Sequence, residues 1–210
     1  MQKRFVAIAI ATVLSLSAHA EVLKTEKATV QMDSLVSGLN HPWGMTFLPD
    51  GRILVTERNG GLLLLSADGK TKTQLNGLPE IDARGQGGLL DVILAPDFSS
   101  SARLYFSFSE PGADGNSTAV ARATLQNDQL SNVSVIFSQQ PKYDSRYHFG
   151  SRLVFDNDGN LFITMGDRGS QRDQAQNLAN HVGTVVRVTG DGAAVEGNPF
   201  TGQAGAKAEI

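Results

Sequence analysis

The sequence contains no cysteine among its 210 residues. This absence excludes disulfide bonds and thiolate metal sites, so the stability of the fold must come from packing of its core. An excess of basic residues is also missing, because 18 lysines and arginines stand against 21 aspartates and glutamates. That balance indicates that the partner of the protein is not a nucleic acid.

Long apolar runs are missing as well, except within the first twenty residues, "MQKRFVAIAIATVLSLSAHA". Lys3 and Arg4 precede an apolar run that ends in small residues at Ala18 and Ala20, a pattern that predicts a secretory signal peptide over residues 1–20. The run is shorter than the roughly 20 residues of a spanning helix. We therefore expect a periplasmic or secreted protein without membrane insertion once the signal is removed. Residues 21–210 carry 16 basic and 21 acidic side chains, a formal charge of −5.

Short apolar segments separated by turn residues fill the rest of the chain. From position 44 onward, turn signals such as Pro49-Asp50-Gly51 separate segments that read as strands, since glycine and asparagine tolerate positive φ. Three units are predicted, with strands at residues 44–48, 52–57, 61–66 and 71–75, then 88–98, 103–110, 118–125 and 132–138, and then 151–155, 160–165 and 183–188. No convincing helix is predicted, although "QAQNLANHVG" is compatible with a turn or two of helix.

The three units repeat one another. "GMTFLPDGRILVTE" matches "RLVFDNDGNLFITM", and the turn aspartates Asp50, Asp97 and Asp158 are 47 and 61 positions apart. Repeats of about 50 residues, each a short meander, are typical of propeller blades. Strands such as "GLLLLS" and "RLVF" are apolar on both faces, as expected between neighbouring sheets. The repeat favours an all-β propeller over the alternative, a two-sheet sandwich.

The number of units is too small for a closed propeller. Three units cannot close a ring of 4 to 8 blades, and "GAKAEI" resembles the start of another strand. We therefore expect residues 21–210 to be the N-terminal part of a single, truncated propeller domain, covering roughly the first three to four blades.

Candidate functional residues lie just before the innermost strand of each unit. In a propeller these loops converge on one face although they are distant in sequence. The three loops contain Trp43, Gln86 and His148. An imidazole can take a proton from an alcohol near neutral pH, and a glutamine amide can donate to and accept from a hydroxyl, while flanking glycines permit close approach of a ligand. The alternative is that His148 is an ordinary loop residue.

Other motifs are rejected. "RGQGGLL" has a leucine at the third glycine position of a dinucleotide fingerprint and precedes a strand rather than a helix. "DNDGNLFITMGD" has Leu161 where a calcium loop needs glycine, so we interpret it as a hairpin turn. The histidines His41, His148 and His181 lack metal-ligand spacing. Trp43 is expected to be a core or floor aromatic rather than a stacking platform.

Several motifs in the same order resemble one family. "HPWGMTFLPDGRILVTER", "GQGGLLDVILAPDF", "HFGSRLVFDNDGNLF", "MGDRG", "AQNLANHVGTVVRV" and "GNPF" together resemble the glucose/sorbosone dehydrogenase family, in particular its soluble aldose sugar dehydrogenases that depend on pyrroloquinoline quinone (PQQ). The resemblance runs from about Leu35 to Ile210. It implies a six-bladed propeller that binds PQQ and calcium and oxidises aldoses to lactones.

The resemblance also implies roles for three residues. His148 matches the general base and would touch the cofactor, Gln86 matches a glutamine near substrate and cofactor, and Arg168 matches a position of the sugar pocket. Two departures stand out: Ser151 replaces a glycine and is expected to crowd the quinone ring, and Arg168 is a cation where glucose-specific members have a neutral amide. Most cofactor ligands and all calcium ligands are expected beyond Ile210, so a 210-residue product is expected to be inactive.

The leading hypothesis is thus PQQ-dependent oxidation of an aldose, with an electron acceptor as second partner and a monomeric or homodimeric state. Two alternatives remain open at this stage. One is a propeller that binds a carbohydrate or a protein without catalysis, since a fold does not determine a function. The other is a propeller hydrolase of lactones, which would need several axial carboxylates around a metal.

Overall fold

The structure is a computed structural model that describes residues 21–210; the predicted signal peptide lies outside this part of the chain. The chain divides at Ser37 into two compact units. In the first unit, β1 (Glu21–Lys24) pairs antiparallel with β2 (Thr29–Met32), and both strands are exposed along their whole length. No helix among the described residues combines the length and apolarity that a bilayer crossing would need.

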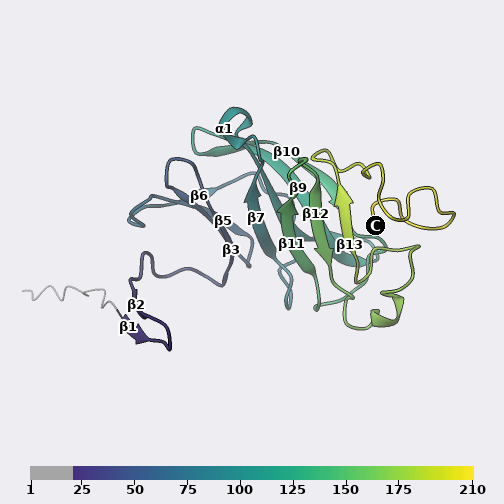
Figure 1. The fold of residues 1–210 in the computed structure, drawn as a ribbon, viewed down its shortest axis with the longest axis horizontal. Helices are drawn as coiled ribbons and strands as arrows, with labels where there is room; N and C mark the ends of the chain where they lie inside the picture. Colours follow the sequence, from purple (N-terminus) through teal and green to yellow (C-terminus); the bar gives the residue numbers. More distant parts are fainter. Residues whose placement is uncertain (1–20) are drawn as a thin grey trace, which may run out of the picture. The chain divides into compact units, whose positions relative to one another are not determined.

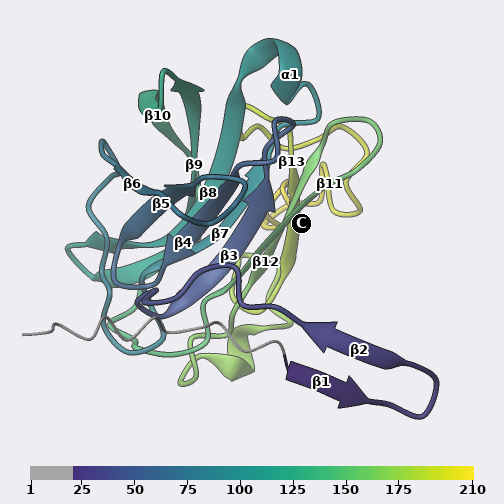
Figure 2. The ribbon, with the colours of Figure 1, turned by 90° about the vertical axis from the view of Figure 1, so that its left-hand side faces the viewer.

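The second unit, residues 38–210, consists of three antiparallel sheets that follow one another along the chain (Figure 1). The first sheet contains β3 (Pro42–Phe47), β4 (Ile53–Glu57), β5 (Gly61–Leu65) and β6 (Lys72–Leu75), in this order (Figure 2). The second contains β7 (Leu89–Leu94), β8 (Arg103–Gly112), β9 (Gly115–Gln126) and β10 (Gln129–Ser138). The third contains β11 (Gly150–Phe155), β12 (Leu161–Met165) and β13 (Val185–Val188).

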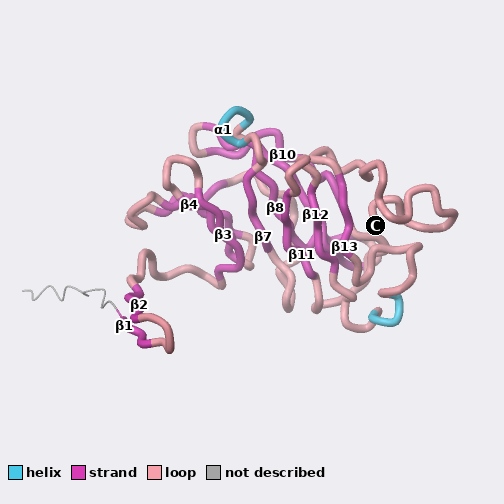
Figure 3. The backbone as a smooth tube through the Cα atoms, viewed as in Figure 1, coloured by secondary structure: helices cyan, strands magenta, loops and turns pink. Residues whose placement is uncertain are grey.

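The prediction of an all-β fold with three repeated units is confirmed, because each unit forms one sheet. The structure also shows what the sequence pattern missed: β8 and β9 are longer than predicted, and two short helices occur, α1 (Phe98–Ser101) and the 3-10 helix η1 (Arg172–Gln174). Figure 3 shows how little of the described chain is helical. The expected strand start at "GAKAEI" is wrong, since residues 205–210 form turns.

Apolar side chains fill both spaces between successive sheets. Leu54 and Leu62 of the first sheet share a core cluster with Leu104 and Phe106 of the second. Val120 on β9 shares another cluster with residues of the third sheet, among them Leu153, Leu161 and Val186. The second sheet is therefore packed on both faces, which a two-sheet sandwich does not provide. Closure of a ring and the number of six blades stay predictions.

The first strand of each sheet carries a bulge at the same place. The antiparallel register shifts after Pro42 in β3, after Leu89 in β7 and after Gly150 in β11, and these positions are 47 and 61 residues apart, like the turn aspartates. A bulge bends a strand and leaves backbone groups unpaired. A buried hydroxyl on the next strand compensates: Gly44 N–H donates to Thr56 Oγ1 at 2.8 Å, and Asp91 N–H donates to Ser107 Oγ at 2.9 Å.

The same hydroxyls connect neighbouring sheets. Thr56 donates from β4 to the Leu90 carbonyl on β7, and Ser107 donates from β8 to the Ser151 carbonyl on β11 at 2.8 Å. The strands β3, β7 and β11 consequently lie side by side, with β7 in the middle (Figure 1).

One expectation about burial is wrong in part. "GLLLL" in β5 is buried on both faces, as predicted, but "RLVF" in β11 is not, because Val154 is 56% exposed. The reason is that the third sheet packs on the second sheet with one face only, through residues such as Leu153.

Candidate functional site

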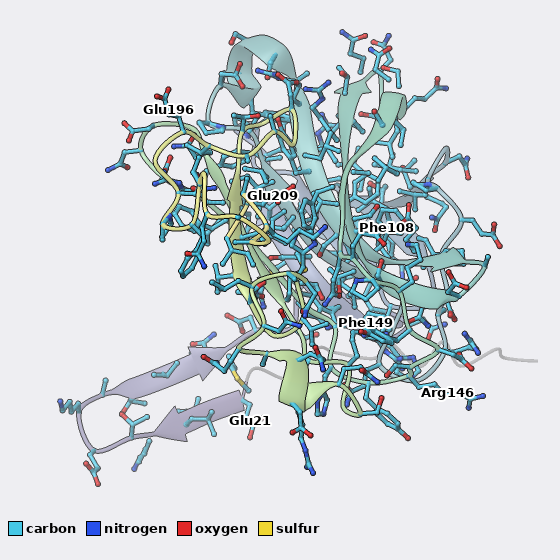
Figure 4. All side chains as sticks on the ribbon, turned by 90° about the vertical axis from the view of Figure 1, so that its right-hand side faces the viewer. Glu21, Phe108, Arg146, Phe149, Glu196 and Glu209 are labelled. Atoms are coloured by element: carbon cyan, nitrogen blue, oxygen red, sulfur yellow. The ribbon has the colours of Figure 1, made fainter. Side chains whose placement is uncertain are left out.

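The loops before β3, β7 and β11 meet at one end of these strands, as the repeat predicted. They enclose a cavity of about 410 Å³ lined by Trp43, Arg58, Gly85, Gln86, Leu90, His148, Phe149, Gly150 and Ser151. Phe149 and Arg146 lie toward the lower end of the sheets in Figure 4. All three sheets or their loops contribute to the wall, so the cavity depends on their packing.

Gln86 and His148 are brought together, although 62 residues separate them. The backbone N–H of His148 donates to Gln86 Oε1 at 2.9 Å, and the N–H of Gln86 donates to the Arg146 carbonyl at 2.8 Å. Because His148 N–H can only donate, this contact identifies Oε1 as the amide atom facing it. The Gln86 amide nitrogen is then the atom that can donate to a ligand in the cavity.

The imidazole of His148 is oriented by a carboxylate. Nδ1 of His148 lies 2.6 Å from Oδ1 of Asp167, which also accepts from the backbone N–H of Gly169 at 2.8 Å. The hydrogen bond from Gly169 and the contact with His148 lower the pKa of Asp167, so the carboxylate is ionised at neutral pH. An ionised carboxylate accepts a hydrogen bond from Nδ1–H, so that in the neutral ring the lone pair is on Nε2.

This arrangement gives His148 the geometry of a general base. Its side chain is 54% exposed and lines the cavity, so a ligand can reach the ring. Asp167 lies against the loop of His148, as the 2.6 Å contact shows. The role of Asp167 in orienting the ring was missed by sequence reasoning, although its position at the end of β12, level with the start of β11, is a usable signal.

The glycines near Gln86 serve the packing of loops. A Cβ atom on Gly85 would lie 2.4 Å from the Arg146 carbonyl oxygen, and one on Gly88 would lie 1.7 Å from the Arg58 carbonyl oxygen. Only glycine permits such close approach. Close approach of neighbouring backbone thus already requires glycine at both positions, and close approach of a ligand stays a prediction.

Arg168 is placed differently from the expected sugar contact. Its side chain is buried, with 1% exposure, and is absent from the cavity wall. Its guanidinium donates to the carbonyls of Ser145 and Tyr147 at 3.1 and 2.8 Å. These contacts occupy the side chain beneath the loop of His148, so the structure offers no direct contact between Arg168 and a sugar in the cavity.

Trp43 lines the cavity and also contacts a cation. The guanidinium carbon of Arg152 lies 4.8 Å from the centre of the Trp43 ring, and Arg152 pairs with the buried Asp91 at 3.0 Å. Burial raises the pKa of Asp91, against the lowering by hydrogen bonds from Leu153 N–H and by Arg152. The three side chains come from β3, β7 and β11 and connect the adjacent strands below the cavity.

Arg58 is a second residue that sequence reasoning missed. It follows β4, lines the cavity, and donates from Nη1 to the carbonyls of Gly85 and Gly87. Because its partners are carbonyls rather than a carboxylate, the charge of Arg58 is available to an anionic ligand.

The other two histidines of residues 21–210, His41 and His181, are absent from the cavity wall. His181 is buried, its Nδ1 accepts from Gln140 N–H at 3.1 Å, and burial lowers its pKa. His41 is exposed and contacts Asn40 Oδ1 at 2.6 Å. Residues 21–210 contain no group of three or more His, Asp or Glu side chains suited to a metal ion.

The comparison with protein families gives one match. The model described as Glucose / Sorbosone dehydrogenase matches residues 39–210. This range includes the whole cavity wall and Asp167.

Individual proteins are similar over most of this chain. The aldose sugar dehydrogenase YliI of Escherichia coli is 44% identical over 87% of this chain and 50% of its own length. A solved glucose dehydrogenase is 46% identical, with a TM-score of 0.78 over 82% of this chain and 51% of that structure. The PQQ-bound aldose sugar dehydrogenase of Streptomyces coelicolor is 29% identical, with a TM-score of 0.73 over 90% of this chain and 54% of that structure. The chain thus spans about half the length of the relatives that it matches.

Proposed function

The chain belongs to the glucose/sorbosone dehydrogenase family, and on this basis we propose that it carries the general base of a PQQ-dependent aldose dehydrogenase. The observation on which the proposal depends is the imidazole of His148, fixed at Nδ1 by Asp167 and placed in a cavity beside Gln86. The similarity to aldose sugar dehydrogenases, one of them PQQ-bound, supports the choice of substrate and cofactor.

The proposed reaction removes one proton and one hydride from the sugar. Nε2 of His148 takes the proton of the anomeric hydroxyl. A hydride, which carries two electrons, leaves the anomeric carbon. The bond between this carbon and the hydroxyl oxygen becomes the carbonyl of a lactone. PQQ, when bound, supplies the acceptor for that hydride. Asp167 stabilises the imidazolium that forms and keeps the ring in one tautomer.

The residues present fit such a cofactor. Trp43 offers aromatic surface to a planar ring, the Gln86 amide and His148 offer polar atoms, and Arg58 carries a charge suited to a carboxylate. We propose Gln86, His148 and Arg58 as contacts of PQQ, and Gln86 also as a donor to the sugar. Residues 21–210 offer no group of acidic side chains suited to calcium.

Replacement of the base tests the proposal. In a full-length version of the protein loaded with PQQ and calcium, His148→Asn is expected to lower the turnover of aldoses by about 10²-fold or more, the usual range for loss of a general base. Asparagine tolerates the positive φ of 52° at this position, so the loop is preserved. Turnover is measured by reduction of an artificial electron acceptor.

A matched control is available in the first sheet. His41 also precedes an inner strand and has a φ of 53°, but it is absent from the cavity wall. His41→Asn is expected to keep turnover within about twofold, since surface changes away from a site have small effects. Equal turnover of His148→Asn and the unmodified protein, with PQQ bound in both, would contradict the assignment of the base.

Cell location and assembly are part of the same proposal. Export to the periplasm predicts that the mature protein begins at Glu21, which mass spectrometry of a periplasmic fraction would check. A monomer or a homodimer is proposed as the state in solution.

A further inference from the structure

The guanidinium of Arg168 donates to three backbone carbonyls of one loop and to a side chain of β9. Nη1 donates to the carbonyls of Tyr147 and His148 at 2.8 and 3.3 Å, and Nη2 donates to the carbonyl of Ser145 at 3.1 Å and to Asn116 Oδ1. The planar fork of arginine presents donors in fixed directions, which a lysine ammonium does not. The conformation of the loop before β11 therefore directs its carbonyls toward the guanidinium.

Arg168 also supports the residue that follows His148. Its guanidinium carbon lies 3.7 Å from the centre of the Phe149 ring, within the range of a cation–π contact. Burial lowers the pKa of Arg168 to about 10, against Asp82 and Asp167, which raise it. The side chain is still charged at neutral pH, and a buried charge is retained only where polar contacts compensate its desolvation.

His148 itself has a backbone conformation that needs support. Its φ of 52° is unusual for a residue other than glycine, and such conformations persist only where the surroundings determine them. The His148 carbonyl accepts from Arg168 Nη1 and, at 3.4 Å, from the backbone N–H of Arg168. It also fits tightly against Gly166, where a Cβ atom would lie 1.7 Å from that oxygen.

We propose that Arg168 is a positioning residue, which holds the loop of residues 145–149 so that the ring of His148 stays against Asp167. This inference rests on the proposed function for its effect on turnover, but the geometry that it describes can be tested without turnover. Arg168 belongs to the same turn as Asp167, so one short segment fixes both the carboxylate and the loop that carries the imidazole.

Two variants separate the shape of the group from its charge. Arg168→Met keeps much of the volume and removes the donors, while Arg168→Lys keeps the charge and loses the planar fork. In both, the carbonyls of Ser145, Tyr147 and His148 lose donors, and the ring of His148 is expected to sample positions away from Asp167. Arg122→Met is the control for loss of an arginine elsewhere, because Arg122 is 27% exposed, bonds the Gly190 carbonyl and Asp191, and is absent from the cavity wall.

The first measurement is nuclear magnetic resonance of the imidazole nitrogens in 15N-labelled protein, with His148→Asn used to assign the signals. The unmodified protein and Arg122→Met are expected to show a protected proton on Nδ1 of His148. In Arg168→Met and Arg168→Lys this signal is expected to be lost or replaced by a mixture of tautomers. If Arg168→Met does not fold, Arg168→Lys decides the outcome.

The second measurement is turnover of the full-length, PQQ-loaded protein. A misplaced catalytic group can cost about 10²-fold in rate, so kcat is expected to fall by about that factor in both Arg168 variants with little change in the KM of the sugar. Retention of the Nδ1 signal and of kcat, with a lower melting temperature as the only change, would overturn the positioning role. Unchanged turnover of His148→Asn would instead contradict the proposed function, while the imidazole signals would still decide whether Arg168 positions the ring.

Discussion

At the residue scale, Ser151 combines two unfavourable features in the wall of the cavity. Its φ is 80°, and its Oγ is buried without a hydrogen-bond partner among the described residues. The family resemblance implies that other members have a glycine at this position. Strain and an unpaired hydroxyl each destabilise the folded state. Ser151 lies in β11, which begins two residues after His148.

Substitution of this serine is therefore expected to stabilise the protein. Ser151→Gly should raise the free energy of unfolding by about 1 kcal/mol, because glycine adopts positive φ without strain and removes the unpaired hydroxyl. Urea unfolding would measure the change. Ser151→Ala removes only the hydroxyl and should give a smaller gain; a glycine variant less stable than the unmodified protein would show that the hydroxyl has a stabilising role.

The sequence predicted the candidate site in part. Gln86 and His148 could be found because the repeat places both before inner strands, and the structure joins them by a hydrogen bond of 2.9 Å. The direction in which a side chain points could not be predicted. Arg168 follows Asp167 directly, yet one is buried under the loop and the other contacts the imidazole. Sequence order does not determine which of two neighbours points inward at a turn with positive φ.

At the scale of elements, strands were predictable where turn residues delimit them. The Asp-Gly and Asn-Gly hairpins located β3 to β6 and β11 to β12 within a few residues. The length of β8 was not predictable, because its pairing with β9 extends beyond the predicted end at Glu110 into Pro111 and Gly112, which are typical turn residues. The bulges were also invisible, since they depend on how the inner strands bend toward one another.

The hydroxyl beside each bulge gives a testable consequence. Ser107→Ala would leave Asp91 N–H and the Ser151 carbonyl without their partner. Buried unpaired backbone groups cost about 1 to 3 kcal/mol each, so the free energy of unfolding should fall by about 2 to 6 kcal/mol. The control is Ser134→Ala on the exposed part of β10, expected to change stability by less than about 0.5 kcal/mol. Equal unfolding midpoints in urea for both variants would show that the hydroxyl of Ser107 contributes nothing to the contact between sheets.

At the scale of the whole molecule, the cavity is a product of packing between sheets. Trp43 comes from the first sheet, Leu90 from the second and Ser151 from the third, and no single sheet contains the site. The second sheet shares core clusters with both neighbours. Loss of either cluster should therefore disrupt the site even where the strands themselves remain paired.

The contact of Arg152 with Trp43 has a practical consequence, because Trp43 is the only tryptophan of the chain. Its ring belongs to the first sheet and the cation to the third, so the fluorescence of the indole reports whether the two sheets stay in contact. Its fluorescence emission should change in the same urea transition as the circular dichroism of the strands, since two-state unfolding makes different probes coincide. An emission change at lower urea would reveal that the inner strands separate before the sheets melt.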